Sequence, residues 1–318
     1  LPILISREVS VATILRILGT KVVIAVISGL VAEYFYLKIF MKKEREPKYI
    51  PSPLNNNMIN YKEYYMGANE KIGYSLLIFV IGGLVGLVFY GGLFKSDGDA
   101  TLATHISNAI FFCIVGIVAL KFFMKTVVES LKDRRAKKLQ KQFMDLLENL
   151  SFSLSSGNTV NDAFLNARGD LLNQYTEKDM IITELNEIVN GIQNGKTLEE
   201  MMQSFGKRSG NEDIENFGNV ISNCYRLGGD FNSVVRKTRL ILGDKVAITE
   251  EINTKLMSNK LQLNAMCIMP IILVAMLKVS STSFAQNLSS AVGVIVTTFA
   301  IGLFVAAYIW GQKIIDIR

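Results

Sequence analysis

The chain has 318 residues, of which 50% are hydrophobic and 19% are charged, and its formal net charge is +6. The charge is concentrated in a central block, residues 127–262, while the regions on both sides contain long apolar runs. This distribution excludes an ordinary water-soluble globular protein and predicts a membrane protein with a large soluble insert. Acidic and basic residues nearly balance within the block, so the basic excess does not indicate nucleic-acid binding.

The first segment, residues 1–41, contains a candidate membrane span at residues 22–41 that Glu33 and Lys38 interrupt. We expect this segment to be amphipathic or to cross the membrane as an additional N-terminal span. A helix that lies at the interface or packs against a partner is the alternative interpretation.

A linker, residues 42–71, follows and contains Pro47, Pro51 and Pro53 ahead of three asparagines. Proline and asparagine interrupt helices, so this composition predicts an extended or flexible tether. The second half of the linker contains tyrosines and lysines that are typical of a membrane-interface belt. They are Tyr61, Lys62, Tyr64, Tyr65 and Lys71.

Four runs without Lys, Arg, Asp or Glu predict membrane-spanning helices, because a bilayer core requires about 20 apolar helical residues. The runs are Ile72 to Phe94, Ala100 to Leu120, Leu261 to Leu277 and Val279 to Gln312. They form one pair of spans within residues 72–126 and a second pair within residues 263–318. The polar group from Ser280 to Asn287 predicts a turn before the last span.

Lys and Arg residues gather after residue 41 and between residues 132 and 141. Positive charge is retained on the cytoplasmic side of a membrane. We therefore expect the linker, the central block and the C-terminus to be cytoplasmic. Anionic lipid headgroups are expected contacts for the basic residues beside the spans.

The central block has the periodicity of helices. Apolar residues recur every three or four positions from Leu139 to Leu154, which is typical of a helix with one buried face. We expect helices near residues 130–156, 160–173, 177–194, 198–208, 212–227 and 231–260, and the first and last should continue into membrane spans. Short glycine turns between them predict a cytoplasmic bundle of about six helices. The predicted fold is an all-α integral membrane protein.

A repeated turn pattern separates these helices. Glycine ends one helix and Thr or Asp caps the next, so that a side-chain oxygen satisfies free backbone amides. We assign structural roles at these turns to Gly157, Thr159, Gly195, Thr197, Gly228, Gly229 and Asp230.

One of these turns also resembles a phosphate-binding loop. The run from Gly191 to Thr197 contains Gly-Lys-Thr, but its spacing is one residue short and a helix, not a strand, precedes it. Helix capping explains the same residues without a nucleotide. The only histidine, His105, has no second ligand or catalytic partner nearby in the sequence, so we predict no catalytic, metal or cofactor site.

Two segments carry a family resemblance. The run from Arg134 to Ala167, RRAKKLQKQFMDLLENLSFSLSSGNTVNDAFLNA, resembles the opening of the type II secretion F domain. The run from Gly195 to Thr238, with its double glycine, resembles the second half of that domain. The layout of spans around the block is most similar to the Tad-type branch of the family.

The resemblance implies a bacterial inner-membrane platform protein of a type IV pilus-like or type II secretion machine, without enzymatic activity of its own. It also implies a cytoplasmic hexameric ATPase and pilin subunits as partners, and assembly with itself or with a paralogous platform protein. Our predicted ATPase-facing residues are Arg134, Arg135, Lys137, Lys138, Lys141, Arg226, Arg236 and Lys237. A lipid-facing or solvated basic surface is the alternative for each of them.

Two other classes of protein remain open at this point. A transporter or channel would also have several spans and a helical cytoplasmic domain, but no charged residue lies in the middle of the four clear spans. The glycines at 82, 83 and 86 serve helix packing in an oligomer as readily as a pore. A membrane-bound sensor or scaffold is the third interpretation.

Overall fold

The computed structural model describes residues 49–315 except 94, 97–98, 101 and 228, and it describes only the backbone at 68, 95–96, 99–100, 102, 225–227 and 315. The predicted N-terminal segment, residues 1–41, lies outside this range. The described chain divides into two compact units. We call the residues within Met66–Thr126 and Thr254–Arg318 the membrane unit, and those within Arg45–Tyr65 and Val127–Asn253 the bundle unit.

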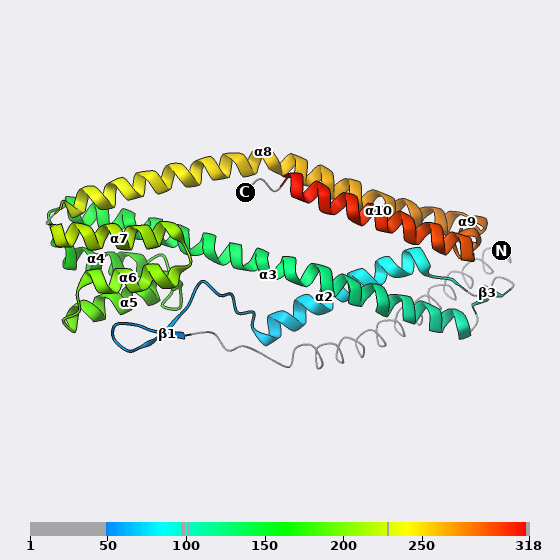
Figure 1. Cartoon of the computed structure of the whole chain (residues 1–318), viewed down its shortest axis with the longest axis horizontal. Helices are drawn as coiled ribbons and strands as arrows, with labels where there is room; N and C mark the ends of the chain where they lie inside the picture. Colours follow the sequence, from blue (N-terminus) through cyan, green and yellow to red (C-terminus); the bar gives the residue numbers. More distant parts are fainter. Residues whose placement is uncertain (1–48, 94, 97–98, 101, 228, 316–318) are drawn as a thin grey trace, which may run out of the picture. The chain divides into compact units, whose positions relative to one another are not determined.

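Helices make up most of the described chain (Figure 1). They are α2 Ala68–Tyr90, α3 Leu102–Ser155, α4 Val160–Leu172, α5 Met180–Gln193, α6 Leu198–Ser209, α7 Glu212–Leu227, α8 Phe231–Ser280, α9 Thr282–Leu288 and α10 Ala291–Ile315. The strands of the described residues form two short antiparallel pairs, β1 Tyr49–Pro51 with β2 Asn57–Ile59 and β3 Lys95–Ser96 with β4 Asp99–Ala100. The predicted all-α class is confirmed.

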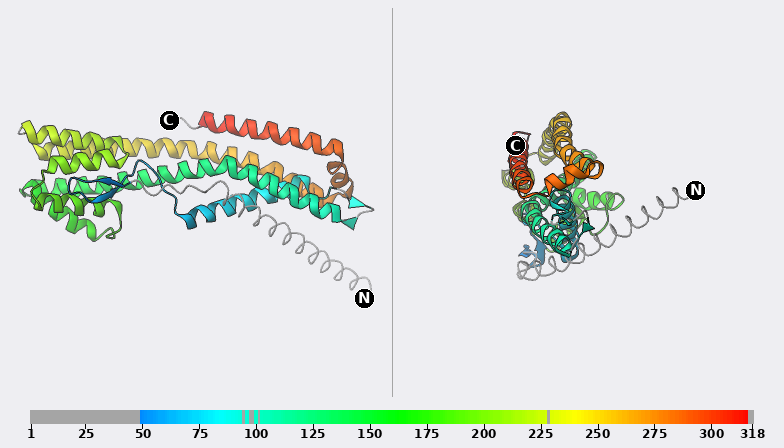
Figure 2. Two further views of the ribbon diagram at one scale, coloured as in Figure 1. Left: turned by 60° about the horizontal axis from the view of Figure 1, so that its bottom comes forward. Right: turned by 90° about the vertical axis from the view of Figure 1, so that its right-hand side faces the viewer.

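Four described helices are long and apolar enough to cross a membrane, namely α2, α3, α8 and α10. The first and last helices of the central block continue into apolar stretches, as predicted. Helix α3 is uninterrupted over 54 residues and α8 over 50 residues, and both carry residues of both units (Figure 2). The expected turn after Ser280 is wrong in part. Most of it forms the seven-residue helix α9, because the Ser281 side chain accepts a hydrogen bond from the Phe284 amide and caps a new helix.

Glycines allow close contact between α2 and α3 in the membrane unit. A Cβ atom added at Gly82 would lie 2.6 Å from the Ala119 Cβ, and one at Gly83 would lie 2.5 Å from the Phe112 ring. The buried rings of Phe79 and Phe112 meet edge to face, with centroids 5.5 Å apart. These glycines therefore serve packing within one chain, as is common where helices approach closely in lipid.

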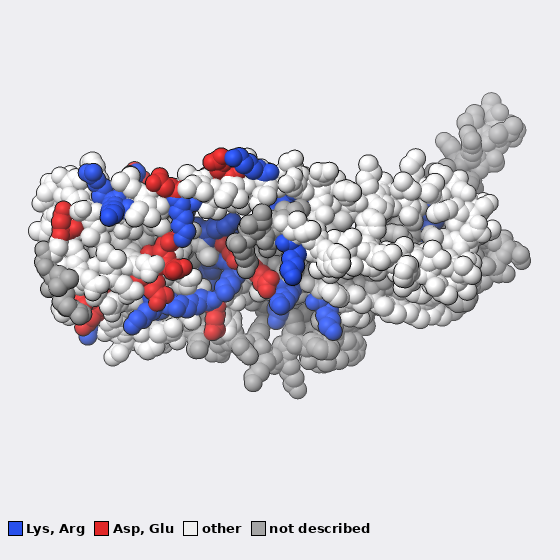
Figure 3. All heavy atoms as spheres, turned by 45° about the horizontal axis from the view of Figure 1, so that its top comes forward, with Lys and Arg blue, Asp and Glu red and all other residues white. Residues whose placement is uncertain are grey.

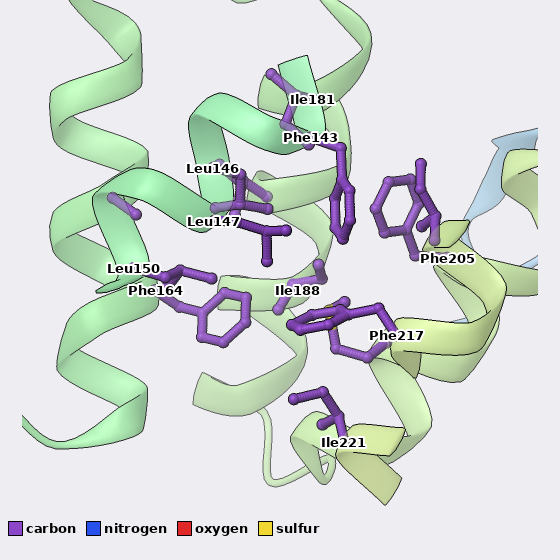
Figure 4. Close-up of a cluster of buried hydrophobic side chains, with 14 of the residues drawn as sticks. Phe143, Leu146, Leu147, Leu150, Phe164, Ile181, Ile188, Phe205, Phe217 and Ile221 are labelled. Atoms are coloured by element: carbon purple, nitrogen blue, oxygen red, sulfur yellow. The ribbon is translucent and has the colours of Figure 1, made fainter. Parts of the chain in front are cut away.

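The core of the bundle unit is built on one face of α3. Phe143 contacts the rings of Phe205 on α6 and Phe217 on α7, with centroids 6.2 and 5.3 Å away. Leucines of α3 and isoleucines of α5 and α7 fill the space around these rings (Figure 4). Each such side chain, when fully buried, stabilises the fold by about 1.5–3 kcal/mol relative to an exposed one.

The linker differs from the expected tether. Residues 49–65 belong to the bundle unit, where β1 and β2 form a hairpin around the left-handed residue Asn55, whose φ is 60°. Leu54, Ile59 and Tyr61 pack against the bundle core. The expectation of an interfacial belt is wrong for Tyr61, which is only 7% exposed, because its ring is part of that core.

Two glycines allow α6 and α7 to approach backbone to backbone. A Cβ atom at Gly206 would lie 2.9 Å from the Glu215 Cα, and one at Gly218 would lie 2.9 Å from the Met202 carbonyl oxygen. Both positions are closer than van der Waals contact permits, so a side chain at either residue must separate the helices.

We therefore expect Gly218→Ala to lower the free energy of unfolding by about 1–3 kcal/mol through overpacking. The matched control is Gly169→Ala on α4, where an added Cβ meets nothing within 4 Å. Because alanine is the better helix former, this control should raise stability by up to about 1 kcal/mol. Thermal unfolding of the purified full chain in detergent compares the two, and equal midpoints would contradict the packing argument.

Candidate functional site

The predicted turn residues lie at helix ends. Gly157 follows α3 and Gly195 follows α5, with φ of +86° and +78°, a conformation that glycine adopts without strain. Thr159 Oγ1 accepts a hydrogen bond from the Asp162 amide at the start of α4, and Thr197 Oγ1 accepts one from the Glu200 amide at the start of α6. These residues set the reversals of the chain.

The third turn joins α7 to α8. The Gly229 amide donates to the Cys224 carbonyl oxygen at 2.9 Å, and the Ser233 amide donates to Asp230 Oδ1 at 3.3 Å. Gly228 lies outside the described residues. The three turns stand at separate helix ends, so the described turn residues do not converge on one ligand.

The run that resembles a phosphate-binding loop forms a helix end followed by a cap. Its amides donate within the turn, from Asn194 to Asn190, from Gly195 to Ile192 and from Lys196 to Gly191. Amides that are already paired in this way are not available to hold phosphate oxygens. The geometry favours the capping interpretation.

The basic residues of α3 separate into two groups. Arg134, Lys137 and Lys141 are exposed. Arg135 instead lies over aromatic rings, with its Cζ atom 5.3 Å from the centroid of Tyr61 and 6.0 Å from that of Tyr64. This contact is a cation–π interaction within the bundle unit.

Lys138 is also engaged within the bundle. Its Nζ atom lies 2.7 Å from Asp179 Oδ1, at the N-terminal end of α5. The Lys138 hydrogen bond and those from Thr176 lower the pKa of Asp179 to about 2, against an opposing effect of burial. Lys138 therefore joins α3 to the start of α5.

The remaining predicted basic residues lie on α7 and α8. Arg236 and Lys237 are exposed in the first turns of α8, and the Arg226 side chain lies outside the described atoms. Arg239, which the sequence did not single out, lies 2.9 Å from Glu148 on α3. Figure 3 shows most of the charge on the bundle side of the visible surface, whereas a large area of the membrane unit carries almost none.

A buried charged pair, which sequence reasoning missed, lies inside the bundle unit. Arg208 on α6 donates from Nη1 and Nη2 to the two carboxylate oxygens of Glu184 on α5, each at 2.7 Å. The exposed fraction of the side chain is 3% for Arg208 and 0% for Glu184. The sequence did contain a signal for this pair. Glu184 and Arg208 both occupy the apolar faces of their helices, beside residues such as Leu185 and Phe205.

Tyr61 of the linker completes this cluster. Its side chain hydrogen-bonds to Glu184, and its amide donates to the Arg208 carbonyl oxygen at 2.8 Å. Burial raises the pKa of Glu184, and the hydrogen bonds from Arg208 and Tyr61 oppose that effect. Burial and the neighbouring carboxylate raise the pKa of the Tyr61 phenol, which therefore acts as a donor.

Removing one partner of the buried pair should be costly. We expect Arg208→Met to lower the free energy of unfolding by on the order of 3 kcal/mol, because it leaves the Glu184 carboxylate buried without its partner. The double variant Glu184→Leu with Arg208→Met removes both charges and should cost less than the single change. Thermal unfolding of the full chain in detergent ranks the three proteins, and a neutral Arg208→Met would refute the pairing.

The Lys138–Asp179 pair predicts a pH dependence. A carboxyl whose pKa falls on folding stabilises the native state above its ordinary pKa, and the contribution disappears as the pH drops through about 2. Lys138→Ala should therefore cost about 1 kcal/mol at pH 6, a modest value because the lysine is largely exposed, and less at pH 3. Lys137→Ala, one residue away and exposed, is the control and should show no such dependence in unfolding measured across this range.

Comparison with known protein families gives a match within the described helices. Residues 146–277 match the family model described as Type II secretion system (T2SS), protein F. The match begins within α3, includes α4 to α7 with the Glu184–Arg208 pair, and ends within α8. No curated protein and no solved structure matches the chain. Over residues 146–277 the chain is therefore similar to the type II secretion system protein F family, whose members are membrane platform proteins of secretion and pilus machines.

Proposed function

We propose that this chain is the inner-membrane platform of a Tad-type, type IV pilus-like or type II secretion machine. In this role the bundle unit is cytoplasmic and binds a hexameric assembly ATPase. The membrane unit acts on pilin subunits as they leave the bilayer. The platform hydrolyses no nucleotide itself and transmits work done by the ATPase. It assembles with further copies or with a paralogous platform protein.

One observation carries this proposal, namely the continuity of α3 and α8. Each helix contributes residues to the bundle unit and also contains an apolar stretch able to cross a membrane. A helix is held by hydrogen bonds between successive turns, so it moves as a rigid element over many residues. A displacement of the α3 side chains in the bundle core is thereby passed along α3 to its apolar stretch.

The surface that we propose for ATPase binding contains fewer basic residues than the sequence predicted. Arg134, Lys137 and Lys141 recur at three and four residues, so they lie on one face of α3, and all three are exposed. Arg135 and Lys138 have contacts inside the bundle and are assigned to its stability. An acidic partner surface would complement the three exposed charges and would speed association.

We expect Arg134→Glu, Lys137→Glu and Lys141→Glu in combination to reduce filament assembly on the order of tenfold or more, through repulsion of an acidic partner. Co-purification of the ATPase with the platform should fall by a similar factor. The control reverses two exposed lysines elsewhere on the bundle, Lys178 and Lys196.

Membrane insertion and thermal unfolding of both variants should match the unmodified chain. The assignment of this surface is wrong if the triple variant retains the ATPase and builds filaments normally. Uptake of a small solute by liposomes that contain the purified chain would instead favour a transporter.

A further inference from the structure

Residues 49–65, which we call the strap, are held to α5 by a buried carboxylate. Ser52, only 4% exposed, donates from Oγ to Glu187 Oε1, and Asn56 donates from Nδ2 to Glu187 Oε2 at 2.9 Å. Glu187 is itself only 6% exposed. The turn of the hairpin is thus fixed to α5 by two charge-assisted hydrogen bonds, which are stronger than neutral ones.

The strap is held to α6 by the buried pair. The Tyr61 amide donates to the Arg208 carbonyl oxygen, and Arg208 Nη1 lies 3.5 Å from the Ile59 carbonyl oxygen. Strap and helix are also in close contact at Gly210, where an added Cβ would lie 3.0 Å from the Lys62 Cα. Gly210 has φ of +66°, so both its conformation and its space require glycine.

The end of the strap lies almost at the start of the first described membrane helix. Only Met66 and Gly67 separate Tyr65 from Ala68, where α2 begins. An extended chain spans at most about 3.6 Å per residue, so this connection allows roughly 10 Å between Tyr65 and α2. A movement of the strap larger than the slack in this connection must move α2.

We propose that the strap is a mechanical connection that ties α5 and α6 of the bundle unit to α2, in addition to the connections through α3 and α8. This inference rests on the proposed platform function, because it assigns a route by which movement of the bundle reaches the membrane unit. The buried contacts of Glu187 and Arg208 hold one end of the strap, and the two-residue connection pulls on α2 at the other.

The decisive experiment lengthens the connection without disturbing the strap. A flexible insert of about six Gly and Ser residues after Tyr65 raises its reach to roughly 32 Å. The strap proposal predicts that filament assembly then falls on the order of tenfold. The control places the same insert after Asn173, in the exposed α4–α5 loop, where surface insertions are well tolerated.

Hydrogen exchange on the full chain in detergent verifies that the strap remains docked in the Tyr65 insertion. The Asn55 and Tyr61 amides, which donate to Ser52 and Arg208, should stay as protected as in the unmodified chain. The double change Ser52→Ala with Asn56→Ala removes the contacts with Glu187 and should speed exchange in the hairpin roughly tenfold or more. Unchanged exchange there would overturn the assigned anchor.

The outcomes separate the two proposals. If deletion of the whole chain leaves filament assembly and secretion intact, the platform function is wrong. If deletion abolishes assembly but the Tyr65 insertion assembles filaments as well as the Asn173 insertion does, the platform function stands and the strap connection is wrong. Reduced assembly in the Tyr65 insertion alone, with the strap still protected, supports both.

Discussion

The bundle unit depends on one buried ion pair, between Glu184 on α5 and Arg208 on α6. Removing two charges from water costs several kcal/mol per ion, and this cost is offset only when the geometry is favourable and the remaining polar atoms are satisfied. Here Arg208 uses both terminal nitrogens on Glu184, its Nε atom lies 3.4 Å from Ser204 Oγ, and Tyr61 supplies another hydrogen bond to Glu184. The pair therefore fixes three chain segments at once.

This arrangement gives specificity that apolar packing does not supply. Apolar contacts between leucine and isoleucine are not directional, whereas a planar guanidinium that binds a carboxylate through two parallel bonds accepts one register. The register of α6 against α5 in turn places the Arg208 carbonyl oxygen where the Tyr61 amide meets it. The strap is thus positioned by helix pairing, although it lies more than a hundred residues earlier in the sequence.

The distance along the chain explains what sequence reasoning could and could not find. Helix periodicity and the Gly and Thr turn patterns are local, so the helices from α3 to α8 could be placed within a few residues. The hairpin could not, because its prolines and asparagines also suit a free tether, and the contacts that hold it to the bundle, such as those with Glu187 and Arg208, come from residues remote in the sequence. For the same reason Arg135 and Lys138 could not be distinguished from their exposed neighbours, since Tyr61 and Asp179 are remote in sequence.

The two long helices are not equivalent as mechanical elements. Helix α3 contains no proline between Leu102 and Ser155, whereas α8 contains Pro270 within its apolar part. Proline cannot donate to the carbonyl four residues earlier, Met266, and its ring crowds that carbonyl, so α8 bends there most easily. The proposed platform role requires a stiff element to carry displacement and a compliant one to permit it. In that role α3 is the stiff element, and α8 follows by bending at Pro270.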